Sequence, residues 1–130
     1  MPFVLIEIRR ECSAAEETAL MDAVHVAVVT ALKLPADDRI VRLQVHAPQR
    51  FACPPGKSRP ELFTLISIDL FSGRSLEAKR NLYAAIAANL GVLGIPADHI
   101  LVRLSEIPRE NWGVRGLPAS EIDLGFKVEV

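Results

Sequence analysis

The chain has little cysteine and no block of charge of one sign, and both scarcities exclude classes of protein. Its 130 residues include two cysteines, Cys12 and Cys53, which lie in unrelated local sequences. Such a pair predicts no structural disulfide, and a reducing, cytoplasmic location is therefore expected. The formal net charge is −1 without a basic cluster, so neither nucleic acid nor an anionic membrane is expected as a partner.

Long hydrophobic runs and metal-ligand spacings are also missing. The apolar stretches carry charges or helical periodicity, which predicts no transmembrane span, and the N-terminal run lacks a signal-peptide pattern. His25, His46 and His99 are far apart and neither cysteine joins them, so no metal site is expected. The remaining composition, 50% hydrophobic and 24% charged, is typical of one globular domain over residues 1–130.

The first half of the chain predicts a strand, a helix and a second strand. Residues 3–8 form a strand-length apolar run. Ser13 and Glu16 form a capping box, in which each side chain satisfies a free backbone N–H group at a helix start. Apolar residues then recur at helical spacing until a proline and two aspartates in residues 34–38 end the helix. Residues 40–45 predict the second strand.

The second half repeats this order with a strand at 62–70, a helix from Ser75 and a strand at 100–104. The Pro-Ala-Asp sequence after the first helix recurs 61 positions later, and such self-similarity decides the architecture. We therefore expect one domain made of two β-α-β repeats and a C-terminal tail: residues 2–46, 62–105 and 106–130.

Two β-α-β units side by side predict an α/β (α+β) fold, a four-stranded mixed sheet with both helices on one face. The other face has no helix left to cover it, so a ring of three protomers is expected. In the tail, residues 122–130 have a strand-like pattern that is expected to extend a neighbouring subunit's sheet. Residues 54–58 suggest part of a phosphate-binding loop, but the glycine expected four residues earlier is missing and no helix follows.

Pro2 is the first candidate for chemistry. Removal of Met1 exposes its secondary amine at the chain terminus, and a free α-amino group has a pKa of about 7.7–8.0. Burial or a nearby cation lowers such a pKa, so the neutral amine suits a general base near pH 7. A proline at the second position also occurs without any such role.

Three features together resemble the tautomerase superfamily: Met-Pro before a strand, the duplicated β-α-β units, and the Gly-Arg-Ser-Leu-Glu-Ala-Lys sequence at 73–79. Residues 73–79 are similar to the helix-opening motif of the 4-oxalocrotonate tautomerases. The spacing over residues 35–39 and the chain length look closer to the double-length, malonate semialdehyde decarboxylase-like members. The resemblance implies a tautomerase/MIF-like fold and an enzyme that needs no cofactor or metal.

The resemblance also implies roles for individual residues. Pro2 becomes the base and Arg74 the clamp for a substrate carboxylate, a role that suits the planar fork of arginine. The alternative is a surface arginine paired with Glu77. Asp38 corresponds to an aspartate that assists water or orients substrate, although it could equally pair with Arg39.

Trp112 resembles an aromatic pocket wall, and a plain packing role is the alternative. The decarboxylase-like relatives have a second arginine where this chain has Ser72, and at a constant offset of 61 Arg74 corresponds to Ser13, with Cys12 beside it. Arg115 in the tail is the candidate for the missing cation.

The expected activity is keto–enol proton transfer on a small 2-oxo acid, catalysed by a homotrimeric, cofactor-independent tautomerase. The missing second arginine favours this activity over its alternative, the decarboxylation or hydration of a short 3-oxo or unsaturated acid. A third interpretation is a trimeric binding protein without catalysis, because a fold by itself does not establish a function.

Overall fold

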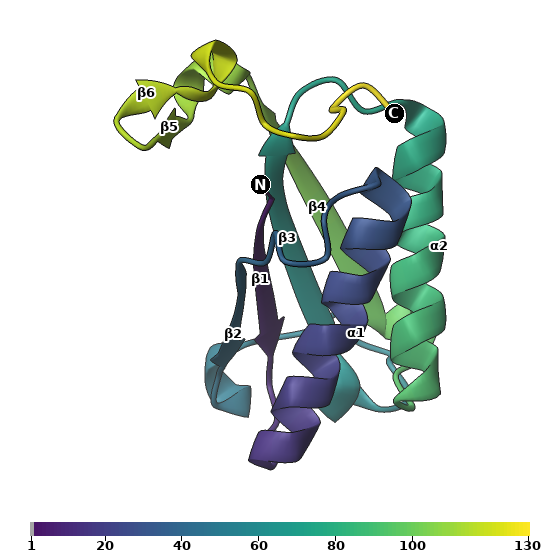
Figure 1. The fold of residues 1–130 in the computed structure, drawn as a ribbon. Helices are drawn as coiled ribbons and strands as arrows, with labels where there is room; N and C mark the ends of the chain where they lie inside the picture. Colours follow the sequence, from purple (N-terminus) through teal and green to yellow (C-terminus); the bar gives the residue numbers. More distant parts are fainter. Residues whose placement is uncertain (1) are drawn as a thin grey trace.

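The computed structural model describes residues 2–130, so Met1, and with it the expected removal of Met1, lies outside the described residues. The described chain forms two long helices, four long strands and a short hairpin (Figure 1). In order these are β1 (Phe3–Ile8), α1 (Ala14–Leu32), β2 (Val41–Val45), β3 (Thr64–Phe71), α2 (Leu76–Val92), β4 (Ile100–Ile107), β5 (Gly113–Val114) and β6 (Leu117–Pro118).

The four long strands form one mixed sheet in the order β2-β1-β3-β4. Within each repeat the strands are parallel, and β1 and β3 join the repeats in antiparallel pairing. Both helices lie on the same face of the sheet (Figure 1). The predicted tandem architecture is therefore confirmed. No helix within residues 2–130 is long and apolar enough to cross a bilayer.

The helices begin where the capping residues predicted. Ser13 caps α1, with the complete reciprocal capping box to Glu16. Ser75 caps α2 by accepting a hydrogen bond from the backbone N–H of Ala78. The strands differ slightly from the prediction, because a 3₁₀ turn (Pro60–Leu62) delays the start of β3 and β4 continues three residues beyond Leu104 to Ile107.

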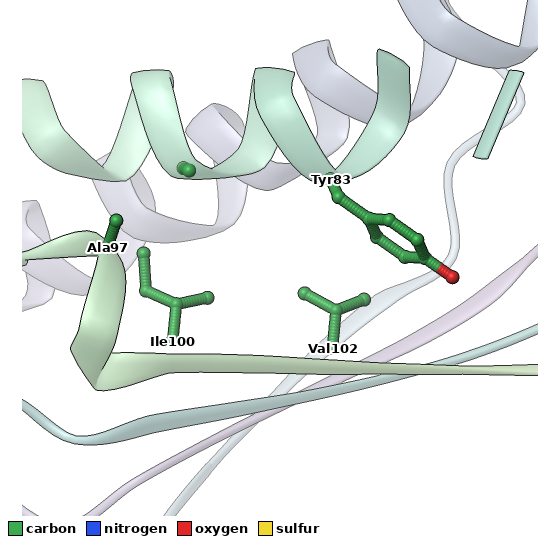
Figure 2. A pocket seen from close by; sticks show the side chains of 5 residues that line it. Tyr83, Ala97, Ile100 and Val102 are labelled. Atoms are coloured by element: carbon green, nitrogen blue, oxygen red, sulfur yellow. The ribbon is translucent and has the colours of Figure 1, made fainter. Parts of the chain in front are cut away.

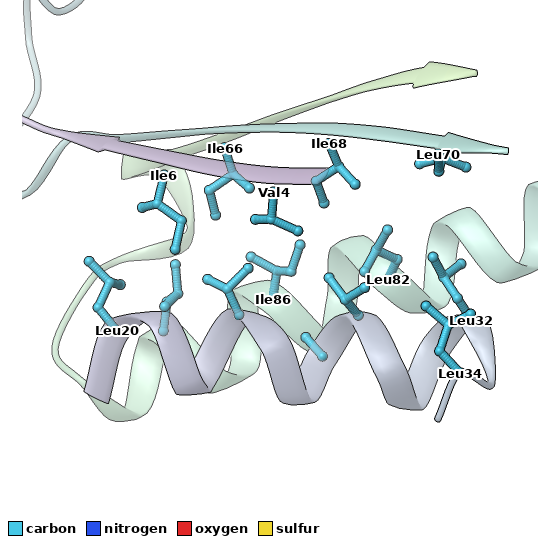
Figure 3. Packing of buried hydrophobic residues seen from close by; sticks show 14 of the residues in the cluster. Val4, Ile6, Leu20, Leu32, Leu34, Ile66, Ile68, Leu70, Leu82 and Ile86 are labelled. Carbon is cyan, nitrogen blue, oxygen red and sulfur yellow. The ribbon is translucent and has the colours of Figure 1, made fainter. Parts of the chain in front are cut away.

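The main core lies between the sheet and the two helices (Figure 3). Alternate residues of the central strands, such as Ile6 and Ile66, are at most 2% exposed and face α1 and α2. Each such side chain contributes about 1.5–3 kcal/mol when fully buried. The opposite sheet face is more open: Leu5 and Leu65 are half-buried, and Leu101 is 59% exposed.

The sheet register corrects the alignment of the two repeats. Val4 pairs with Val41 in the first repeat and Ile66 with Val102 in the second. The offset is therefore 61 between β2 and β4 but 62 between β1 and β3, and the helix caps Ser13 and Ser75 share the offset of 62. The counterpart of Arg74 is thus Cys12, and the expected equivalence with Ser13 was wrong.

The tail also differs from the expectation of an exchanged strand. Residues 122–130 form no strand. They pack on their own chain, where Val128 is fully buried with Phe71, Trp112 and Ala119. The N–H of Ser75 donates to the carbonyl oxygen of Val130 over 2.8 Å. The apolar residues of this segment were expected to pack on a neighbouring subunit. Val128 instead packs inside its own subunit.

Candidate active site

The topology brings the predicted site residues to one end of the sheet. The mixed order places the starts of β1 and β2 beside the ends of β3 and β4: Phe3 pairs with Asp69, and Val4 donates to the carbonyl oxygen of Ile40. The N-terminus, the β5–β6 hairpin and the C-terminal tail lie near this end (Figure 1). We call it the proline end, because Pro2 precedes β1 there.

Pro2 is buried directly before β1. The next side chain, Phe3, packs edge-on against Trp112 with ring centroids 4.8 Å apart. Trp112 also packs against Phe71 at 4.9 Å and is 6% exposed. Its indole N–H donates to the carbonyl oxygen of Ile107 over 3.1 Å. With that donor engaged, Trp112 has the packing role, in a cluster with Phe71, Ala119 and Val128; its role as a pocket wall stays a prediction.

Arg74 is buried, which rules out the alternative of a surface arginine. It is 6% exposed, and its Nη1 donates to the carbonyl oxygen of Phe71 over 3.0 Å. Its Nε has no hydrogen-bond partner among residues 2–130. A buried N–H group without a partner is costly, so this guanidinium retains capacity for an acceptor.

Burial lowers the pKa of Arg74 and the neighbouring charge of Arg109 lowers it further, whereas the carboxylates of Glu129 and Asp38 act in the opposite direction. An arginine remains protonated at neutral pH despite such shifts. Gly73 holds the turn before Arg74 at φ +124°, a conformation that other residues rarely adopt. The local backbone thus places a permanent cation beneath the tail.

Asp38 and Arg115 line one cavity of ≈ 310 Å³. Its remaining walls come from the segment before β2, from the β5 strand and from the tail: Pro35, Asp37, Val114, Ile122, Asp123, Leu124 and Phe126. Arg74 is not among the lining residues. The structure therefore joins Asp38 and Arg115 in the cavity, with Arg74 buried nearby and coupled to Asp38 through charge.

Local backbone geometry fixes the positions of both Asp38 and Arg115. Arg115 and Gly116 connect β5 and β6 with φ values of 51° and 80°, as in a type I′ hairpin turn. The backbone N–H of Asp38 donates to the carbonyl oxygen of Pro35 over 3.0 Å. Arg39 forms an ion pair with Asp22 on α1. A left-handed non-glycine residue such as Arg115 is uncommon and marks a constrained position.

Two backbone N–H groups at the start of α2 are already engaged within the chain. The N–H of Ser75 is engaged by Val130, and that of Ala78 by the Ser75 hydroxyl. Neither donor is available for a ligand while the tail and the cap stay in place.

Two charged residues at the proline end were missed by the sequence analysis. Arg109 follows the end of β4 by two residues, as Arg74 follows the end of β3 by three. Glu129 in the tail pairs with Arg109 over 3.2 Å. Because β3 and β4 are parallel, their ends meet, and an arginine shortly after each strand was a usable signal for a pair of cations.

A second cavity of ≈ 270 Å³ lies between α2 and the edge strand β4 (Figure 2). Its lining has no charged side chain: Tyr83, Ala87, Ala97, Ile100 and Val102. Apart from the phenol of Tyr83, this lining offers no group for acid–base chemistry, and it offers no cation to bind a small acid. Among residues 2–130, no three His, Cys, Asp or Glu side chains are grouped to hold a metal ion.

Comparisons with known proteins agree on one family. The family model described as "Tautomerase enzyme" matches residues 38–115. A probable tautomerase of Ralstonia nicotianae is 39% identical over 57 residues, 43% of this chain and 81% of that protein. A 2-hydroxymuconate tautomerase of Comamonas testosteroni is 32% identical over 56 residues, 42% of this chain and 89% of its own length.

Solved structures extend the likeness over both repeats. A fused 4-OT symmetric trimer has a TM-score of 0.77 at 30% identity, covering 91% of this chain and 96% of that one. A malonate semialdehyde decarboxylase inhibited by 3-bromopropiolate has a TM-score of 0.72 at 28% identity, covering 85% and 86%. The family model covers more than half of the chain, and the likeness to the fused 4-OT structure extends over 91% of it. The chain therefore belongs to the tautomerase family.

Proposed function

We propose that the protein is a cofactor-independent tautomerase that moves a proton between carbon atoms of a small 2-oxo acid. One observation carries the proposal. Both repeats contribute to the proline end, Pro2 and Asp38 from the first and Arg74 from the second, and Arg74 is buried with an unpartnered Nε. The named activity of the Comamonas relative, a 2-hydroxymuconate tautomerase, supports the same chemistry.

The proposed step begins with the neutral amine of Pro2, after loss of Met1. Its nitrogen takes a proton from the carbon alpha to the carbonyl group. The electron pair of the broken C–H bond forms the enolate double bond, and the carbonyl oxygen takes up the negative charge. The protonated amine then returns the proton, to the oxygen for enolisation or to another carbon for isomerisation, and is neutral again. Burial of Pro2 favours the neutral amine. Arg74 attracts the acid group, Arg115 supplies positive charge to the cavity that Asp38 lines, and Trp112 limits access of water.

The test asks whether Pro2 is the N-terminal residue and whether it acts as the general base. Mass spectrometry of the protein from its own cells should show loss of Met1. The Pro2→Ala variant keeps a terminal amine of altered basicity, and its kcat/KM for phenylpyruvate enolisation should fall about 100-fold or more, as for a lost general base. Pro55→Ala, in an exposed loop, is the matched control. Retained Met1, or equal rates for Pro2→Ala and wild type, would disprove the role of Pro2.

A second candidate is decarboxylation or hydration of a short 3-oxo or unsaturated acid. It is favoured by Asp38, which lines the cavity with Arg115, and by the likeness to malonate semialdehyde decarboxylase. Release of CO₂ from a 3-oxo acid by wild type, strongly reduced in Asp38→Asn, would promote this candidate over tautomerisation. If the intact trimer shows no activity on a panel of oxo acids, the result would favour a non-catalytic binding protein.

We further propose a homotrimer in the cytoplasm. The half-open sheet face with Leu5, Leu65 and Leu101 supports self-association, as does the trimeric fused 4-OT neighbour. Cys12 and Cys53 are free thiols, which fits a reducing compartment. Light scattering of the purified protein tests the trimer; a monomeric mass at micromolar concentration would refute it.

A further inference from the structure

The C-terminal tail holds a carboxylate over the arginines of the proline end. Glu129 Oε1 lies 3.2 Å from Arg109 Nη2 and 3.7 Å from the position that a Cβ atom on Gly73 would occupy, next to Arg74. The tail is anchored on both sides of Glu129, because Val128 is fully buried and Val130 accepts a hydrogen bond from Ser75. Glu129 is thus held in place, although its side chain remains 65% exposed.

The positive charges near Glu129, on Arg74 and Arg109, are of the kind that binds a carboxylic acid. Arg74 and Arg109 lie close enough to repel each other, and Glu129 attracts Arg74. Arg109 pairs directly with Glu129, while Arg74 lies within reach of both charges. Neighbouring guanidinium groups of this kind recognise anionic ligands. Here the carboxylate is that of Glu129, a residue of the same chain. Arg74 Nε still has no hydrogen-bond acceptor among residues 2–130, so Glu129 does not satisfy all donors of the two arginines.

We propose that Arg109 is a second carboxylate-binding cation beside Arg74, and that Glu129 occupies this arginine pair until an acidic substrate displaces it. Glu129 is then a specificity-determining residue that sets the affinity for the acid group. The inference rests on the proposed function for the identity of the ligand, a 2-oxo acid. It adds the tail as an internal competitor at that site.

Two readouts separate this inference from the proposed activity. Calorimetric titration with phenyllactate, a 2-hydroxy acid that cannot enolise, measures carboxylate binding without turnover. Phenylpyruvate kinetics measure KM and kcat. The charge-removing variant is Glu129→Gln, and its matched control is Glu121→Gln, an equally charged and exposed residue of the same tail. Arg109→Gln removes the proposed second cation.

Glu129→Gln should bind phenyllactate about threefold more tightly and lower the KM for phenylpyruvate by the same factor at unchanged kcat, a size typical of one exposed ion pair. Arg109→Gln should weaken phenyllactate binding about fivefold. The gain in Glu129→Gln should shrink in 0.5 M NaCl, because salt screens exposed charges. The methyl ester of phenylpyruvate, which lacks the charge, should show no gain.

The inference is overturned if Glu129→Gln binds phenyllactate no more tightly than wild type, or if Glu121→Gln gives the same gain, which would indicate a general charge effect. It is overturned too if no variant binds phenyllactate at millimolar concentration. If phenyllactate binding responds as expected while no protein enolises phenylpyruvate, the proposed activity is wrong and the role of Glu129 stands.

Discussion

The two ends of the sheet are related by the internal repeat, but several counterpart residues differ in type and in contacts. The offsets of 61 and 62 assign each residue of the proline end a counterpart at the far end, where residues 46–63 form the connecting loop (Figure 1). Pro2 corresponds to Thr64 and Asp38 to His99. Arg74 corresponds to Cys12, and Trp112 to Phe51, which follows an equivalent 3₁₀ turn.

At the far end these counterparts make contacts within the protein. His99 is fully buried; its Nδ1 lies 2.8 Å from Asp98 Oδ1, and its Nε2 accepts the backbone N–H of Arg59. The Thr64 hydroxyl donates to the carbonyl oxygen of Leu62. Phe51 packs edge-on against Phe63 with ring centroids 6.1 Å apart.

Arg9 shows the same difference. Its guanidinium donates to three backbone carbonyl oxygens of the far-end loop, from Phe51, Pro60 and Pro48. Arg74 at the proline end donates to one carbonyl and keeps Nε unpartnered. Arg9 is half-buried and its hydrogen bonds stabilise the far-end loop. Its neighbour Arg10, like Arg74, has a buried nitrogen without a partner among residues 2–130, so a spare donor occurs at both ends. The contacts of His99, Thr64 and Arg9 indicate a structural role for the far end, whereas the candidate residues Pro2, Asp38 and Arg74 gather at the proline end.

The largest expected effect is on kcat/KM, and it should differ between Arg74 and its far-end counterpart Cys12. Arg74→Gln should lower kcat/KM for phenylpyruvate about 100-fold, within the range for removing one partner of a desolvated charge pair. Cys12→Ser at the far end should change kcat/KM less than twofold. Steady-state kinetics on both variants measure this, and similar losses in both would contradict the assignment of function to the proline end.

Substitutions at the far end should lower the free energy of unfolding more than substitutions at the proline end, the reverse of their expected effects on activity. His99→Ala removes a fully buried side chain and the acceptor of the Arg59 N–H group, so the free energy of unfolding should fall by about 3 kcal/mol. Asp38→Ala should cost less than about 1 kcal/mol, as expected for a partly exposed residue. Urea unfolding at one fixed protein concentration gives both values, and a larger loss for Asp38→Ala would reverse our interpretation of the two ends.

The helix caps are where the two repeats remain alike. Ser13→Ala and Ser75→Ala each remove a side-chain acceptor at a helix start, and each should lower the free energy of unfolding by about 1 kcal/mol. Thermal or urea unfolding compares them. A difference of more than about 1 kcal/mol between the two variants would contradict the equivalence of the two caps.

The smallest effect is a pH dependence at the far end. The hydrogen bond from His99 and the charges of His99 and Lys57 hold the pKa of Asp98 below its usual value. A carboxylate with a depressed folded pKa stabilises above its unfolded pKa, and that contribution is lost as the pH falls through the folded value. The stability difference between wild type and Asp98→Asn should therefore be present at pH 7 and shrink toward pH 3. A difference that does not change with pH would exclude this linkage.

Much of the fold was predictable because its signals are local. The capping box at Ser13, the cap at Ser75 and the repeated Pro-Ala-Asp sequence depend on residues within a few positions of each other. They located both helices and the repeat. The one-residue difference between the offsets was not predictable, because strand register is decided by pairing across the sheet. That difference moved the counterpart of Arg74 from Ser13 to Cys12.

The sequence by itself determined the duplicated β-α-β order, the helix starts and the candidates Pro2, Arg74 and Asp38, since each depends on local pattern or motif. Only the tertiary structure decided that Val128 is buried in its own subunit and that Arg109 and Glu129 meet beside Arg74. Side chains from β3, β4 and the tail become neighbours only when parallel strands end at the same edge. Contacts over such separations arise from packing, which no local pattern encodes.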